Sequence, residues 1–299
     1  MDQLDTFLDA LKIEGNLSSN TIEAYAGDLR RFNGYLNSHR STRQTAVHVT
    51  PEVMTRFLDA EDDSGFSPST LQRRKMVLSQ YAQYLVTIGV FDVNEVEEIH
   101  QWQPNLWQKI YRQDILVLSR SEIEQLLKPP SAQGPIKSFR DLAIVSLLLE
   151  TGLLISAVLS LQVSQIDNDK KMLSVISGGR RNYRIPRSAP SISKYLVEER
   201  PEVTQSMEDD ILFISQLGGP ISRQGGWQII KNIGGRLGLQ VPLSPRVLRH
   251  TAVRLMIENG LNSNEIQDRL GHTNIYSTRA LIRKIKRAIK IRKDENHND

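Results

Sequence analysis

The hydrophobic pattern of this 299-residue chain changes its period once, between residues 163 and 187. Over most of the chain, apolar residues recur at intervals of three and four, which predicts amphipathic helices. Between residues 163 and 187, short apolar runs flank the Gly178-Gly179 pair, which predicts antiparallel strands joined by a turn. Helical spacing returns from Ser191. The sequence therefore predicts a mainly α fold with a small three-stranded antiparallel β-sheet.

Two domains are expected, because a domain averages roughly 150 residues. Four helical patterns fill residues 1–90 and predict a compact helical domain. Residues 91–117 contain two tryptophans and a proline but no clear periodicity, which predicts an ordered connector. A second domain is predicted at residues 118–293, followed by a mobile tail at residues 294–299.

Composition excludes several classes of protein. The chain contains no cysteine, which excludes disulfide bonds and thiolate metal sites. The longest apolar run, Leu142 to Ile155, contains Ser146 and Glu150 and is too short to span a bilayer. The first five residues, Met-Asp-Gln-Leu-Asp, lack the basic region of a signal peptide. We therefore expect a cytoplasmic protein that does not enter the membrane.

Positive charge is clustered rather than spread along the chain. The formal net charge is only +4, but eight Lys or Arg residues and no acidic residue lie between Arg279 and Lys293. Two smaller clusters lie at Arg73–Lys75 and Arg180–Arg184. Clustered cations favour a nucleic-acid partner, because each neutralised phosphate releases condensed counterions. Solvated helix faces are the alternative explanation for any one cluster.

Several short motifs occur in an order and at a spacing that resemble one known family. In the predicted N-terminal domain they are Leu17–Thr21 and Ser67–Thr70, followed by Arg73. In the predicted second domain they are Arg140-Asp141, Thr151–Leu153, Gly218–Ser222, Leu248–Thr251 and Leu270–His272. Together they are similar to the phage-integrase type of tyrosine recombinase, and within it to the Xer-like branch.

This resemblance implies a two-domain clamp around duplex DNA, built from a helical SAM-like core-binding domain and an integrase-type catalytic domain. In that family a tyrosine attacks a phosphodiester and forms a 3′-phosphotyrosyl bond, without a metal ion or another cofactor. Arginines and histidines stabilise the transition state, since charge gathers on the non-bridging phosphate oxygens, and a lysine protonates the leaving oxygen. The implied partner is double-stranded DNA, and no small-molecule substrate is implied.

Most of the reacting groups that the resemblance implies are replaced in this sequence. Arg249 and His272 are retained, and Arg246 stands where the family has the first histidine of a His-x-x-Arg pair. Four other residues replace functional groups of the family: Leu154 the first arginine, Ala157 an acidic residue, Gly178 the lysine and Leu281 the tyrosine. The retained motifs therefore predict phosphate binding more strongly than strand cleavage.

Tyr276 is the only tyrosine after residue 250 and so the only local candidate nucleophile. If this stretch is helical, Tyr276 is displaced from the position of Leu281 by about 7.5 Å and about 140°. A displacement of about 1 Å is already costly for a reacting group, so cleavage by Tyr276 requires a loop that re-aims it. Arg180 or Arg181 would bind phosphate in place of the lysine, but arginine is a poor proton donor.

The predicted phosphate contacts are spread over both domains. They are Arg73, Arg74, Arg180, Arg181, Ser222, Arg223, Arg246, Arg249 and His272. An alternative for Arg249 and His272 is that both are structural, because buried polar side chains are commonly satisfied by core hydrogen bonds. Trp227 is interpreted as a core residue.

Three functions are compatible with this sequence. The first is a DNA-binding recombinase homologue that has lost strand transfer and acts as an architectural partner or regulator of an active recombinase. The second is a divergent active recombinase that uses Tyr276. The third is a protein-interaction module with residual DNA binding. The C-terminal helix, in which isoleucines alternate with cations, is expected to dock on a second protomer or on an active recombinase partner.

Overall fold

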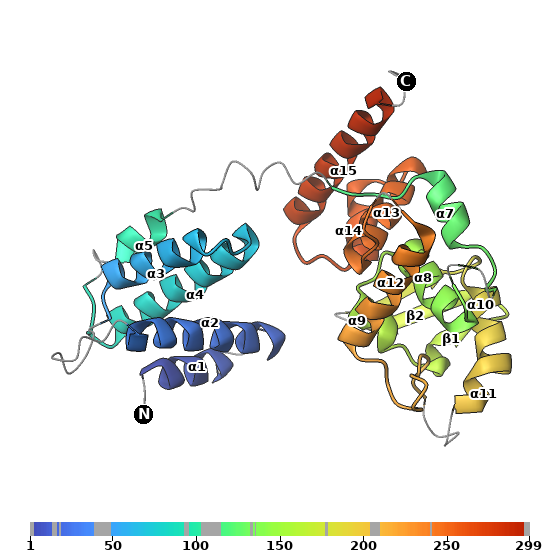
Figure 1. Cartoon of the computed structure of the whole chain (residues 1–299). Helices are drawn as coiled ribbons and strands as arrows, with labels where there is room; N and C mark the ends of the chain where they lie inside the picture. The colour runs from blue at the N-terminus through green and yellow to red at the C-terminus, as the bar shows by residue number, and fades with distance from the viewer. Residues whose placement is uncertain are drawn as a thin grey trace. The chain divides into compact units, whose positions relative to one another are not determined.

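The computed structural model of the chain divides into two compact units, Met1–Gln113 and Asp114–Asp299. Figure 1 shows the helices and strands of both units. The residues described are 3–13, 17, 19–38, 49–92, 96–102, 115–131, 134, 136–176, 179–203, 210–239 and 241–295. Gly178, the predicted replacement of the lysine, lies outside these residues.

Unit 1 is built from helices. They are α1 (Gln3–Ile13), α2 (Ser19–Ser38), α3 (Pro51–Asp63), α4 (Pro68–Thr87) and α5 (Glu97–Gln101). α3 follows Thr50 and α4 follows Ser67, and each hydroxyl accepts a hydrogen bond from an N–H of the first turn. Each of these helices also starts with a proline, which has no N–H to leave unpaired.

Aromatic side chains of α1 to α4 form much of the core of unit 1. Phe7 packs against Tyr81 with ring centroids 5.3 Å apart, and Phe32 packs edge-on against Phe57 at the same separation. Residues 96–102 belong to the segment predicted as a connector, but their large apolar side chains are buried in this core.

Unit 2 combines helices with a small antiparallel sheet. The sheet has the order β1-β2-β3, with β1 at Ile166–Asp167, β2 at Met172–Ile176 and β3 at Arg180–Arg184. Its register pairs Leu173 with Tyr183, and both side chains are buried. These strands lie where the hydrophobic period changes, so the predicted mainly α fold with a three-stranded sheet is confirmed.

The rest of unit 2 consists mainly of helices that pack against one another. They are α7 (Arg120–Leu126), α8 (Phe139–Thr151), α9 (Ile155–Leu159), α10 (Ala189–Lys194), α11 (Arg200–Val203), α12 (Arg223–Leu237), α13 (Pro245–Glu258), α14 (Ser263–Leu270) and α15 (Ile275–Glu295), with a 3₁₀ turn at Val163–Gln165 and a π-helical turn at Tyr195–Glu199. α15 extends two residues into the predicted tail, whose remaining residues 296–299 lie outside the description. Among the helices described, none has the length and apolar character needed to cross a membrane.

The end of α8 packs closely against α13 and α14. Gly152 terminates this helix in the left-handed conformation, with φ of 69°, and its N–H donates to the Leu148 carbonyl. A Cβ at Gly152 would lie 3.0 Å from Leu270 Cδ2 and 3.2 Å from Met256 Cε. Glycine therefore allows the end of α8 to approach α13 and α14 closely.

Candidate functional site

Arg249 is the centre of the candidate site. It lies on α13, which begins at Pro245 after the capping residue Ser244. Its Nη1 donates to the Gly152 carbonyl at 2.5 Å, and its Nη2 donates to the Leu270 carbonyl at 3.2 Å. Burial lowers the pKa of Arg249 below its ordinary value. The arginine thus connects the ends of α8 and α14 through neutral carbonyl groups.

His272 completes this arrangement and is held from both sides. Its Nε2 lies 3.0 Å from Arg249 Nη2, and its Nδ1 lies 2.9 Å from Oγ1 of Thr278, which is fully buried. Because a guanidinium only donates, Nε2 accepts and the proton resides on Nδ1, which donates to Thr278. Burial, followed by the charge of Arg249, lowers the pKa of His272, so the ring is neutral at pH 7. In this arrangement His272 orients Arg249, and both of its ring nitrogens are engaged.

Arg181 approaches the same place from the sheet. In the register of β2 and β3 it pairs with Val175, next to the turn. A Cβ built at Gly271, whose φ is 67°, would lie 2.5 Å from Arg181 Nη1. The guanidinium therefore packs against the backbone immediately before His272. Arg180, one residue nearer the turn, is exposed.

Arg246 adds a further cation on α13. It lies three residues before Arg249, which places both on one side of the helix, and its side chain is exposed. Its charge also lowers the pKa of the neighbouring His250, although burial is the larger cause. The structure thus gathers Arg181, Arg249 and His272, with Arg246 on the adjoining turn.

The position expected for the first catalytic arginine contains an exposed apolar side chain. Leu154 is the residue before α9, its side chain makes no capping hydrogen bond, and it is 55% exposed. It lies two residues after Gly152, whose carbonyl binds Arg249. A side chain here faces solvent close to the site, but leucine supplies no charge for a phosphate.

The geometry of α15 separates the candidate nucleophile from this site. The stretch is helical from Ile275, so the loop required to re-aim Tyr276 is not formed. Tyr276 lies two residues before Thr278, which rotates it by about 200° around the helix, away from the side that contacts His272. Leu281 lies only about 60° from Thr278. The residue on the His272 side is thus a leucine, whereas the tyrosine is 73% exposed on the other side.

Helix α12 carries two other predicted phosphate contacts at its start. Ser222 caps the helix by accepting from the Gly225 N–H at 3.0 Å, and Arg223 is exposed beside it. The core assignment of Trp227 is wrong, because its side chain is 44% exposed and lies 5.1 Å from Lys231 Nζ. The inward side of the helix carries Gly226, Ile230 and Ile233, and Gly226 packs against Leu159.

In unit 1, the arginines of the predicted cationic cluster form ion pairs with carboxylates of the same unit. Arg74 is only 5% exposed, and its guanidinium binds Asp28 and Glu61. Arg73 makes two hydrogen bonds with Asp28, at 2.7 and 3.0 Å, and Arg31 binds Glu61 at 2.8 Å. The hydrogen bond to Asp28 raises the pKa of Arg73, whereas burial lowers that of Arg74. The phosphate contact predicted for Arg74 is incompatible with this position, because its charge is neutralised inside the unit.

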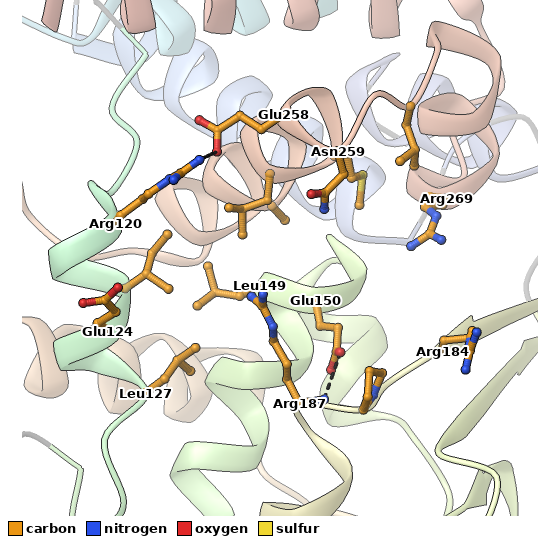
Figure 2. Close-up of a pocket in the computed structure, with 16 residues that line it drawn as sticks. Arg120, Glu124, Leu127, Leu149, Glu150, Arg184, Arg187, Glu258, Asn259 and Arg269 are labelled. Atoms are coloured by element: carbon orange, nitrogen blue, oxygen red, sulfur yellow. Dashed lines mark hydrogen bonds and ion pairs between the residues drawn. The ribbon is translucent and has the colours of Figure 1, made fainter. Parts of the chain in front are cut away.

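A large cleft in unit 2 lies apart from the predicted site. The cleft has a volume of about 920 Å³, and Figure 2 shows its charged rim. On one side Arg120 faces Glu258, with 3.6 Å between nitrogen and oxygen. Glu150 accepts from the backbone N–H of Arg187 at 3.0 Å. None of the predicted phosphate contacts lines this cleft, whose lining carries both arginines and glutamates.

Sequence reasoning did not identify Thr278, because its importance comes from one contact. The hydroxyl lies six residues after His272 and meets its ring only because α15 turns back beside α14. No periodicity or motif marks a threonine at this spacing. The retained Arg249 and His272 were identified because each lies in a motif, and the structure brings them into contact.

Two family models match the chain. The model described as "Phage integrase family" matches residues 117–286, which is more than half of the sequence. The model described as "Phage integrase, N-terminal SAM-like domain" matches residues 4–89.

Curated relatives match over nearly the whole length. The chain is similar to tyrosine recombinase XerD of Chlorobaculum tepidum, with 29% identity over 280 residues that cover 92% of this chain and 89% of the relative. It is also similar to tyrosine recombinase XerC of Herpetosiphon aurantiacus, with 27% identity, 92% of this chain and 88% of the relative.

Solved structures share the fold. The XerH site-specific recombinase bound to palindromic difH substrate gives a TM-score of 0.67 with 18% identity and covers 90% of this chain and 78% of its own. The Tn1549 transposon integrase in complex with transposon right end DNA gives 0.70 with 16% identity and 94% of both chains. A lambda integrase dimer bound to a COC′ core site gives 0.69 with 14% identity and 93% of both chains.

Proposed function

Because the chain belongs to the phage integrase family, we propose that it is a DNA-binding tyrosine recombinase homologue that has lost strand cleavage. It acts in DNA recombination by binding duplex DNA, as an architectural partner or regulator of an active recombinase. The proposal keeps the cytoplasmic location predicted from the sequence.

The main support for the proposed loss of cleavage is the orientation of α15. The side of this helix that reaches His272 presents Thr278 and Leu281, and Tyr276 lies on the other side of the same helix. A second cost comes from Leu154, because removing one donor that stabilises the transition state costs about 3 kcal/mol. With neither a nucleophile nor the first arginine, the remaining cations bind a phosphodiester without reacting.

Phosphate binding is supported by the charge of the site. Arg249 donates to two carbonyl oxygens and to a neutral imidazole, and no carboxylate among the described residues pairs with it. Its remaining N–H groups suit a phosphate oxygen, and Arg181 and Arg246 add two cations nearby. Ser222 and Arg223, at the start of α12, and Arg180, next to the turn of the sheet, extend the proposed contact surface. Relatives whose structures contain DNA or a dimer suggest the same partner and a second protomer docked through α15.

The proposal is tested on duplexes that the full-length protein selects from a random-sequence pool. We expect selected duplexes to bind with an affinity that falls steeply as salt rises, because the contacts are to phosphates. Nicked versions of the same duplexes are then tested for a covalent protein–DNA adduct, and none is expected. An active family member on its own nicked site is the positive control.

Two results would overturn the proposal. An adduct that disappears in the Tyr276→Phe variant would identify an active recombinase. Failure of the folded protein to select any duplex would favour a protein-interaction module. Arg249→Gln serves as the matched binding control in both experiments, since it removes the central cation and leaves Tyr276 intact.

A further inference from the structure

A separate groove lies between α14 and α15, with a volume of about 530 Å³. Ile257 at the end of α13, Leu261 and Asn262 in the following turn, and Ser263 and Ile266 of α14 form one part of its lining. Tyr276, Arg279, Ile282, Arg283 and Lys286 of α15 form the other part. We call it the α14–α15 groove.

The charged and aromatic side chains of α15 that line the groove lie on a different side of the helix from Thr278. Tyr276, Arg279, Arg283 and Lys286 are separated by three, four and three residues, so their side chains fall within about 80° of one another around α15. Thr278, which contacts His272, lies about 80° from Lys286, the nearest of them, and about 160° from Tyr276 on that circle. A duplex bound at Arg249 therefore leaves the function of these four residues unexplained.

The charge of the groove has one sign. Arg279, Arg283 and Lys286 are exposed, and none of the described residues that line the groove is acidic. Within the described part of the chain, these three side chains make no ion pair or hydrogen bond. Two carboxylates adjoin lining residues in the sequence: Glu258 pairs with Arg120 and Arg254, and Glu265 binds the backbone N–H of Asn262 at 2.7 Å. The groove thus offers uncompensated positive charge.

Its floor is apolar. Ile266 is buried, and Ile257, Leu261 and Ile282 are half-buried while packing against the same small core. A DNA backbone has no apolar side chain to bury in such a concave site. An amphipathic helix has both features, since its apolar anchors fill a groove and its flanking carboxylates meet cations on the rim.

We propose that the α14–α15 groove binds an acidic amphipathic helix of a partner protein. Tyr276 then serves as part of the binding surface, which accounts for a large aromatic side chain that is 73% exposed and turned away from His272. This inference deepens the proposed regulatory role by naming the chemistry of the partner. It is tested separately from DNA binding, so that either can fail alone.

The probe is a synthetic helical peptide of about 18 residues, or five turns, with leucines at intervals of three and four and glutamates beside them. It is titrated into the full-length protein labelled at isoleucine methyl groups. We expect saturable shifts at Ile257, Ile266 and Ile282, which line the groove. A matched peptide with glutamine in place of glutamate should bind more weakly.

Two variants distinguish binding in the groove from nonspecific attraction to the positive charge of α15. The double variant Arg279→Gln, Arg283→Gln should weaken peptide binding about tenfold, the sum of two rim pairs. Arg287→Gln is the control, because Arg287 is an exposed cation of the same helix that does not line the groove, and it should change binding less than twofold.

Three outcomes would overturn the inference. The first is the absence of saturable shifts, and the second is an equal effect of the double and control variants. The third is a duplex affinity that falls in the double variant well beyond the control while peptide binding stays constant, which would make the groove a DNA contact. A concentration-dependent dimer that the double variant disrupts would instead identify a second copy of this chain as the occupant.

Discussion

Arg74 of unit 1 is buried and Arg249 of unit 2 is half-buried, and the partners of the two guanidinium groups differ in charge. Arg74 binds two carboxylates, Asp28 and Glu61. Arg249 binds two backbone carbonyls and the neutral ring of His272. The carboxylates neutralise the positive charge of Arg74. The neutral acceptors orient the guanidinium of Arg249 but leave its charge uncompensated.

This difference separates a structural arginine from one that is poised for an anion. A buried ion pair is tolerated in the fold as long as both partners remain. Because its charges compensate each other, it leaves no free charge to bind a ligand. An arginine oriented by neutral acceptors keeps its charge and is preorganised for phosphate. Clusters of cations in a sequence do not distinguish the two cases, because the partners come from elsewhere in the chain.

The largest expected effect is on the stability of unit 1 when the ion pair between Arg74 and Glu61 is broken. Glu61→Gln removes a carboxylate that binds Arg31 and Arg74, so a buried cation loses part of its compensation. We expect the free energy of unfolding of unit 1 to fall by about 3 kcal/mol, measured by urea denaturation and circular dichroism. Glu52→Gln breaks an exposed pair with Arg56 and should cost less than about 1 kcal/mol. Equal costs would contradict the comparison.

The burial of His250 in unit 2, together with its cationic neighbours, predicts a pH dependence of stability. Burial, followed by the charge of Arg246, lowers the pKa of His250 to about 4. The unfolded chain, with a histidine pKa of about 6.5, therefore binds the proton first as the pH falls. Stability is present above about pH 6.5, and about 3 kcal/mol is lost as the pH falls to about 4.

The check is a series of urea denaturations between pH 7.5 and pH 4, at steps of about half a unit. His250→Gln removes the titrating group, so its stability should depend less on pH over this range. Parallel profiles for the two proteins would show that carboxylates alone cause the loss.

A smaller effect is expected on DNA binding when the two arginine environments are compared directly. Arg249→Gln should weaken duplex binding about tenfold and reduce the salt slope by about 1, since one phosphate contact is lost. Arg73→Gln, whose charge is held by Asp28, should change the affinity by less than about twofold. Fluorescence anisotropy over a range of salt measures both. A loss with Arg73→Gln as large as with Arg249→Gln would restore the cluster of unit 1 as a DNA contact.

The smallest expected effect concerns Thr278, which orients Arg249 through His272. Thr278→Val keeps the volume but removes the acceptor for Nδ1, so duplex affinity should fall about threefold. Thr278→Ser should restore most of it. Nitrogen NMR of the imidazole adds a readout that loss of packing does not mimic, because Arg249 keeps the proton on Nδ1 in all three proteins and only the valine variant removes its acceptor. An Nδ1–H signal that is unchanged in the valine variant would refute the positioning role.

The sequence was most informative where the structure depends on residues that are close together in the chain. The change of hydrophobic period located the strands, because alternation along a strand and helical spacing are local patterns. The motifs around Arg249 and His272 identified two residues that do meet. The partners of Arg73 and Arg74 were not predicted, since Asp28 lies about 45 residues away in the chain. Trp227 was misassigned because an apolar side chain does not reveal which face of its helix packs inward.

Sequence alone determined the fold class, the retained cations and the absence of a tyrosine at residue 281, because each is written in local pattern or residue identity. Only the tertiary structure decided which cations keep their charge, which side of α15 meets His272, and that Tyr276 belongs to another surface. Those properties depend on contacts between segments far apart in the chain, and a helical rotation of about 200° separates neighbours only two residues apart.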